Sequence, residues 1–410
     1  MAFGAGPDDE ALRAAWLAFC ARLAEAGERA FKDHNPATPL HRADAFRFLA
    51  QNLGQAFDLA LETKDPRYPA LHAFCSPTRK LGGDAADFVY HQAWIDGTCA
   101  YRIVGNRGTA RFLNFTVQGP RPDTIPGTGW PSLHEPFGDI PEANLFGHQL
   151  QADADGHFEL FIGGEPRASN WLPTTPGSRK LFLRQGFDRW DERPAQMRIE
   201  RVGMAEPRPL PTPQAMVDAM AWAGDFVTGL MRDWPDHPYQ YGNAVDPVNV
   251  NRFPPDPADD AASDAKRGRM VANLCWALAR DEALIVEFDA HDGFWMVTNM
   301  GVFFNSMDYA YRPVSYTPAR TAVDADGKIR LVLAHDDPGV HNWVDTQGFE
   351  RGNLCYRNLL SQTHTRFRTQ VVRRDALDAA LPADTLRVSK DERVAQLRMR
   401  FEAIRRRYGQ

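Results

Sequence analysis

Two segments of this 410-residue chain, one starting at Asp153 and the other at Asp324, share the same order of features. Each begins with Asp-Ala-Asp-Gly, continues into an apolar run typical of a strand, and then has a proline, an Asn-Trp pair and an arginine. The corresponding residues are Asn170-Trp171 and Arg179 in the first segment and Asn342-Trp343 and Arg351 in the second. Similarity of this length and order favours duplication of a whole domain over chance.

The spacing of apolar residues predicts an α+β fold, mainly β, with two duplicated β-sandwich domains and helical N-terminal, linking and C-terminal segments. We expect a helical segment over 1–75, a first sandwich over 76–205, a helical linker over 206–282, a second sandwich over 283–374 and a C-terminal helix within 375–410. Within the linker, the pattern predicts helices over 212–232 and about 263–280.

Short motifs refine this plan. Asp-Gly pairs at 96–97 and 292–293 predict hairpin turns that correspond in the two copies. Ser389 and Glu392 have the spacing of a capping box, which predicts the start of the last helix. The apolar stripe expected for that helix consists of Val394, Leu397, Phe401 and Ile404.

Composition limits the classes of function. The net charge of −6 provides no general attraction to nucleic acid or to anionic lipid. Five scattered cysteines form no C-x-x-C pair, which argues against a thiolate zinc site. No export signal or long apolar run is evident. We therefore predict a cytoplasmic protein with a small-molecule ligand and with neither nucleic acid nor membrane as partner; homo-oligomerisation is left open.

The stretch over 294–360, above all LAHDDPGVHNWVDTQGFERGNLCYRNLL, resembles the C-terminal motif of the domain of unknown function 1214 (DUF1214) family. The first copy resembles the same family more loosely. The resemblance implies bacterial origin, a β-sandwich of the jelly-roll or nucleoplasmin-like kind, and a domain often paired with DUF1254. It implies no agreed reaction, so no catalytic residue is transferred from the family.

The second copy has a polar loop after its apolar strand, where the first has Gly163-Gly164-Glu165. The Asn-Trp pair and the arginine occur in both copies, and a structural role explains them best. Residues that occur in only one copy can have a functional role. The loop contains His335, Asp336, Asp337, His341, Asn342 and Asp345.

Three interpretations of this loop remain open. In one, His335 acts as general acid/base with Asp336 or Asp337, while Arg351 or Arg357 steadies a developing anion. In another, His335 and His341 hold a divalent metal with the carboxylates. In the third, these residues only hydrogen-bond within the loop. No cofactor is predicted apart from that metal.

Aromatic residues near the predicted strands suggest a ligand-binding surface. The candidate ligand-binding residues are Trp343, Asn342, Trp295, Tyr309, Tyr311 and Arg357. The leading hypothesis is an enzyme that acts by acid/base chemistry on a small aromatic, lipid-like or sugar-like molecule. One alternative is a non-catalytic protein that binds a carbohydrate or hydrophobic ligand, and the other is a structural or interaction module.

Overall fold

The computed structural model describes residues 6–32, 35–120, 139–234, 250–253, 269–359, 361, 363 and 365–409. Within these ranges the protein is mixed α+β and mainly β, with four sheets in two sets and helices at the N-terminus, in the linker and at the C-terminus. None of the described helices combines the length and the apolar character needed to cross a membrane.

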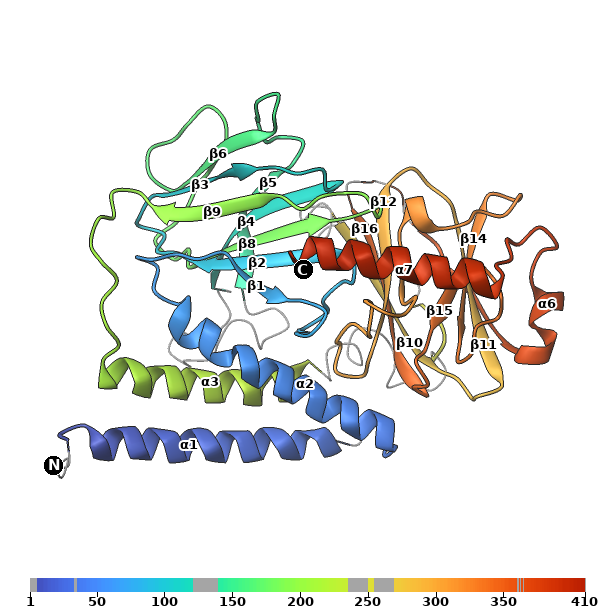
Figure 1. Ribbon diagram of the computed structural model, residues 1–410, viewed down its shortest axis with the longest axis horizontal. Helices are drawn as coiled ribbons and strands as arrows, with labels where there is room; N and C mark the ends of the chain where they lie inside the picture. The colour runs from blue at the N-terminus through green and yellow to red at the C-terminus, as the bar shows by residue number, and fades with distance from the viewer. Residues whose placement is uncertain are drawn as a thin grey trace.

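The first set of sheets, here called the first block, spans residues 72–201 and forms a sandwich (Figure 1). One sheet has the order β1-β2-β8-β4-β5 and the other the order β7-β6-β3-β9. An apolar core that includes Ile103, Phe115 and Leu183 fills the space between them. The strands are β1 (His72–Cys75), β2 (Phe88–Trp94), β3 (Tyr101–Asn106), β4 (Phe112–Pro120), β5 (Asp139–Phe146), β6 (His157–Ile162), β7 (Trp171–Leu172), β8 (Lys180–Gly186) and β9 (Gln196–Arg201).

The second block spans residues 269–373 and repeats this topology. Its sheets have the orders β10-β16-β12-β13 and β15-β14-β11-β17, which match the first block strand for strand once β1 is set aside. The strands are β10 (Arg269–Ala277), β11 (Glu282–Asp289), β12 (Phe294–Met300), β13 (Ser315–Tyr316), β14 (Lys328–Ala334), β15 (Trp343–Asp345), β16 (Arg351–Leu359) and β17 (Arg368–Arg373).

The repeated motifs make the same hydrogen bonds in both blocks. The Asn170 side chain bonds both backbone groups of Gln151 and the carbonyl of Glu159, and Asn342 does the same with Ala322 and Arg330. The indole N–H groups of the adjacent tryptophans donate to carbonyls at the ends of β6 and β14. Gly156 and Gly327 close identical turns with φ of +85° and +80°, a conformation that favours glycine. The Asn-Trp pairs and the turn glycines therefore make equivalent backbone hydrogen bonds in the two blocks.

Three long helices cover one face of the first block and reach the second (Figure 1). They are α1 (Asp9–Glu28), α2 (Pro39–Phe57) and α3 (Pro213–Asp233). Thr38 and Thr212 cap α2 and α3, with proline at the first helical position of each. The helices share one apolar core with both blocks; this core contains Phe226 from α3, Phe88 from β2 and Phe294 from β12.

The last long helix, α7 (Lys390–Arg407), follows the short α6 (Leu377–Ala380) and crosses from the second block to the first (Figure 1). The capping box of Ser389 and Glu392 is confirmed. The predicted apolar stripe is wrong at Val394, which is 64% exposed. Arginines face the protein instead: Arg393, Arg400 and Arg407 recur every seven residues and are buried. Their guanidinium groups lie over the aromatic rings of Trp343, Trp190 and Phe187, respectively.

Two further predictions from local pattern are wrong. The segment predicted as a helix over 263–280 contains strand β10, which pairs along its whole length with β16. The Asp-Gly pairs at 96–97 and 292–293 join β2 to β3 and β11 to β12, which lie in different sheets. They are therefore links between the layers of a sandwich, not hairpins, and they occupy different places in the two blocks.

Candidate functional site

The polar loop of the second block places its histidines in structural hydrogen bonds. The Nε2 atom of His335 lies 3.2 Å from the Leu278 carbonyl oxygen, and its Nδ1 lies 2.9 Å from the Thr346 hydroxyl. The Nε2 of His341 lies 3.2 Å from the Arg320 carbonyl, and Gln396 donates to its Nδ1. Burial lowers the pKa of His341 below its usual value. With both nitrogens occupied, neither ring presents a free lone pair to a metal.

The carboxylates of the loop point to other partners. Asp336 is exposed, and Asp337 pairs with Arg393 of α7 at 2.9 Å. Asp345 is buried and pairs with Arg312 at 2.9 Å; burial raises its pKa. Among the described residues, no group of three or more side chains is arranged to bind a metal ion.

The remaining predicted residues are dispersed. Trp295 lies in the core of the second sandwich, and Tyr309 is buried beneath α7 with its hydroxyl 3.2 Å from that of Tyr408. Tyr311 is 61% exposed and stacks on Phe401. Trp343 packs beside Arg393, and Arg351 begins β16. Asn342 holds loop backbone, as described above. None of these residues hydrogen-bonds to the His335 ring, whose partners are Leu278 and Thr346.

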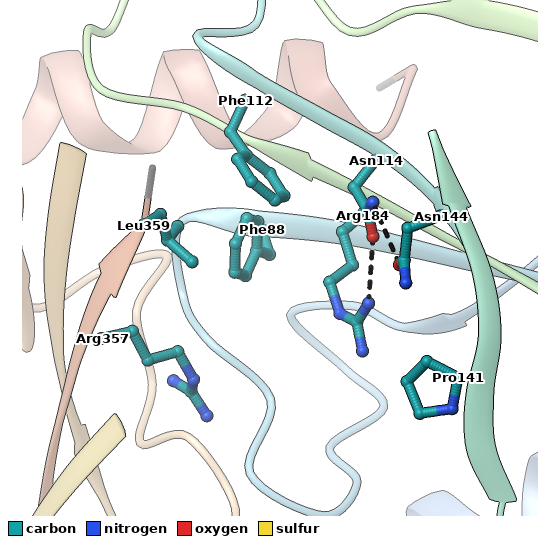
Figure 2. Close-up of a pocket in the computed structure, with 8 residues that line it drawn as sticks. All are labelled: Phe88, Phe112, Asn114, Pro141, Asn144, Arg184, Arg357 and Leu359. Carbon is teal, nitrogen blue, oxygen red and sulfur yellow. Dashed lines mark hydrogen bonds between the residues drawn. The ribbon is translucent and has the colours of Figure 1, made fainter. Parts of the chain in front are cut away.

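Arg357, the other predicted ligand-binding residue, lines a pocket between the two blocks (Figure 2). The pocket is small and partly open to solvent. Its remaining lining residues are Phe88, Phe112, Asn114, Pro141, Asn144, Arg184 and Leu359. They come from β2, β4, β5 and β8 of the first block and from β16 of the second. A pocket at an interface of two packed units is a common place for a small ligand.

One part of this wall is apolar. Phe88 and Phe112 are both buried, with ring centroids 5.6 Å apart, and the ring of Phe294 from the second block lies 6.5 Å from that of Phe112. Leu359 continues this surface. The cluster of rings therefore joins the blocks and presents an apolar side to the pocket.

The other part is polar. Arg357 is only 6% exposed; its Nη2 donates to the Gly83 carbonyl, and its Nη1 has no hydrogen-bond partner. A buried guanidinium N–H without an acceptor costs free energy, so its persistence beside a pocket suggests that a ligand supplies the acceptor. From the first block, the Arg184 Nη1 donates to Asn114 Oδ1 at 3.3 Å, and the Asn114 amide lies 3.5 Å from Asn144.

Gly186 allows the aromatic cluster to close. A Cβ atom there would lie 2.5 Å from Phe88 and 2.8 Å from Phe294. We expect Gly186→Ala to lower the free energy of unfolding by about 1–3 kcal/mol, because ring carbons on two strands must move. Urea denaturation measures the loss. Gly203→Ala serves as a partial control, since a Cβ there meets no atom within 4 Å although its φ is +77°; a loss at Gly186 no larger than at Gly203 would contradict the proposed close packing.

Most of the pocket residues were not found from the sequence. On β4 the polar residues Asn114, Thr116 and Gln118 alternate with apolar ones. Such alternation ordinarily indicates a strand with one face in solvent. In the structure every residue of β4 except Pro120 is buried, and on the polar face Phe112 packs against Phe294 of the second block while Asn114 and Thr116 contact Asn144 of β5. Arginine and amide side chains on that face could have indicated a polar pocket, but only if the burial of the strand had been known.

Two kinds of comparison with known proteins, with family models and with solved structures, found matches. The family model described as "Protein of unknown function (DUF1214)" matches residues 90–185, in the first block. The crystal structure of an uncharacterised protein from Burkholderia cenocepacia is 31% identical, with a TM-score of 0.78, over 88% of this chain and 97% of that one. The VPA0106 protein from Vibrio parahaemolyticus is 12% identical, with a TM-score of 0.41, over 80% of this chain and 98% of that one. No curated protein matches the chain. Residues 90–185 of the chain therefore match the DUF1214 family of proteins of unknown function.

Proposed function

We propose that the protein binds a small organic anion with an apolar part in the pocket between the two blocks. The observation that carries this proposal is the Nη1 group of Arg357, a buried donor without a partner in the wall of the pocket. A carboxylate or phosphate oxygen is the acceptor that a guanidinium binds best. The rings of Phe88 and Phe112 provide the apolar contact.

Binding is favoured over acid/base chemistry in this pocket. Its described lining contains two arginines, two asparagines and four apolar residues, but no carboxylate or imidazole that could move a proton at neutral pH. The acid/base role of His335 stays a prediction. Its geometry offers little support, since both ring nitrogens already have partners within the protein.

We also infer that the second block is a diverged copy of the DUF1214 unit. The support is the equal strand order and the equal hydrogen bonds of the Asn-Trp pairs and turns. In this view the pocket lies where two copies of one unit meet.

We expect Arg357→Gln to weaken binding of an aromatic carboxylate about 10- to 100-fold, because a hydrogen bond to a charged group contributes about 1.5–3 kcal/mol. Benzoate is the probe, with neutral benzamide for comparison, and isothermal titration calorimetry gives the dissociation constants. The wild-type protein should prefer benzoate, and Arg357→Gln should remove the preference.

Arg351→Gln is the matched control, because Arg351 lies on the same strand but does not line the pocket. It should bind benzoate like the wild type. Thermal denaturation shows whether each variant is folded, since Arg357 also holds the Gly83 carbonyl. Equal binding of benzoate by the wild type and by folded Arg357→Gln would refute the proposal.

A further inference from the structure

Arg407, the last residue of α7, carries a guanidinium group that is buried where the helix meets the two blocks. The residue is 5% exposed, and its guanidinium carbon lies 4.4 Å from the centroid of the Phe187 ring. Its Nη1 group donates to Oδ1 of Asp87 at 3.3 Å, whereas Nε and Nη2 are buried and have no acceptor in the described part of the chain. Nε–H and Nη2–H lie on the same edge of the planar group, so two parallel donors lack an acceptor.

Two more arginines bring positive charge to the same place. The side chains of Arg320 and Arg400 are buried, and their guanidinium carbons lie 4.1 and 5.0 Å from the centroid of the Trp190 ring. The guanidinium carbon of Arg407 lies 5.4 Å from the same centroid. Arg400 donates to the hydroxyl and carbonyl oxygens of Ser315, which are neutral and do not balance its charge. The three guanidinium groups therefore lie around one indole ring.

The carboxylates nearby balance only part of this charge. The two oxygens of Asp87 are shared between Arg320, at 2.6 Å, and Arg407, at 3.3 Å. Asp188 accepts a hydrogen bond from Arg320 through its carbonyl, but its carboxylate pairs with Arg111. Burial lowers the pKa of Arg407; Asp87 opposes this shift and Arg320 adds to it. Among the described residues, three buried cations thus share one carboxylate, and buried charge without a counter-charge is costly.

We propose that a small inorganic oxyanion, such as phosphate or sulfate, binds along the Nε–Nη2 edge of Arg407. Two parallel N–H groups of a guanidinium match two oxygens of an oxyanion, and such charge-assisted pairs are among the strong hydrogen bonds in proteins. A water molecule would satisfy the donors without balancing the excess positive charge. The site does not depend on the proposed function, because Arg407 is not among the residues that line the pocket between the blocks.

Phosphate is the probe, and thermal unfolding of the full chain is the measurement. Chloride keeps the ionic strength constant, so that general screening does not change. We expect the unfolding temperature to rise with phosphate concentration and then to level off, with a total shift of about 2 °C or more, because phosphate binds the folded state only. Arg407→Lys keeps the positive charge but lacks the paired donors, and it should lose most of this shift.

Two variants serve as controls. Arg405→Lys changes an exposed arginine in the last turn of α7 and should show the full wild-type shift. Arg357→Gln removes the unpartnered donor of the pocket between the blocks and should keep the shift that Arg407→Lys loses. The second control separates a failure of this proposal from a failure of the proposed function.

A wild-type unfolding temperature that does not change with phosphate would overturn the proposal, and so would equal shifts in the wild type and in folded Arg407→Lys. A shift that disappears in Arg357→Gln but not in Arg407→Lys would place the phosphate in the pocket and also overturn it. If Arg407→Lys does not fold, hydrogen exchange of the wild type decides. Phosphate should then slow exchange over the last turn of α7 more than over α1, which packs on α3; equal slowing in the two helices would overturn the site.

Discussion

Asp87→Asn is expected to lower the free energy of unfolding by about 3–5 kcal/mol, the largest effect of any single substitution considered for this protein. Asp87 is fully buried where the first block, the second block and α7 meet. Its carboxylate lies 2.6 Å from Arg320 and 3.3 Å from Arg407. The amide of asparagine has nearly the same volume, so the variant removes the charge without leaving a cavity.

The arginines around Asp87 explain the size of this effect. Arg320, Arg400 and Arg407 all lie within about 6 Å of the Trp190 ring, at 4.1, 5.0 and 5.4 Å. Asp87 is the carboxylate that both Arg320 and Arg407 pair with. Without it, buried guanidinium groups face each other uncompensated, and removing one member of a buried charge cluster is far more costly than breaking a surface pair.

Guanidinium denaturation followed by circular dichroism measures the loss. Asp191→Asn is the matched control, because Asp191 pairs with Arg189 at the surface, where the pair is screened by solvent, and its loss should leave stability nearly unchanged. Hydrogen exchange should also rise over α7, since Arg407 anchors the end of that helix. A variant that unfolds at the wild-type denaturant concentration would show that Asp87 does not hold the blocks and helix together.

The pH dependence follows from the same contacts. Burial raises the pKa of Asp87, but Arg320, Arg407 and Arg400 outweigh burial and hold it below its ordinary value. The carboxylate therefore contributes stability that is complete above the unfolded pKa of about 3.9 and is lost as pH falls through the lower folded value. The difference in free energy of unfolding between the wild type and Asp87→Asn should be constant from pH 7 to about pH 5 and should become smaller below about pH 4.

Features that repeat along the chain, or depend on a few neighbouring residues, could be predicted from the sequence. The two Asp-Ala-Asp-Gly turns, the helices capped by Thr212 and Ser389, and the backbone hydrogen bonds of the Asn-Trp pairs all follow from local chemistry. Comparing the two repeated segments also separated the residues that both contain from the residues that only one contains. That comparison assumed that the functional residues are the ones found in only one segment.

That assumption would not have found the pocket, because Arg184 and Arg357 line it from corresponding strands of the two blocks. An ungapped alignment from the Asn-Trp pairs places Gln185 opposite Arg357, one residue away from Arg184. Only the pairing of strands corrects the shift. The arginine face of α7 was missed for a related reason: burial of a guanidinium depends on a carboxylate distant in the sequence, such as Asp87 for Arg407.

A second buried cluster, formed by Lys80, Asp84 and Ser306, joins the two blocks. The Lys80 ammonium lies 2.9 Å from the Ser306 hydroxyl, which lies 2.5 Å from Asp84. The Ser306 backbone N–H donates to the same carboxylate at 2.8 Å. All three residues are buried, and the Lys80 ammonium sits 3.5 Å above the ring of Tyr309. The cluster ties the segment before β2 to the loop between β12 and β13.

Asp84→Ala should lower the free energy of unfolding by about 3 kcal/mol, because two donors of Ser306 lose their acceptor and Lys80 loses its counter-charge. Urea denaturation measures this loss. Asp58→Ala is the control: Asp58 pairs with Arg79 where both are about one-third exposed, and less than about 1 kcal/mol is expected. Similar losses in the two variants would show that the buried cluster is no stronger than a surface pair.

The pH dependence of Lys80 provides a sharper test. Burial lowers the pKa of Lys80 to about 8, and Asp84 opposes this shift. In the unfolded chain the Lys80 ammonium keeps its proton up to about pH 10, whereas in the folded protein it loses the proton near pH 8. The free energy of unfolding therefore increases as the pH rises above about 8. In Asp84→Ala the pKa of Lys80 falls further, so the increase in the free energy of unfolding begins at a lower pH. In Lys80→Met this increase should be absent. Stability measured between pH 6.5 and 9.5 distinguishes the three proteins, and parallel curves would mean that Lys80 does not titrate in this range.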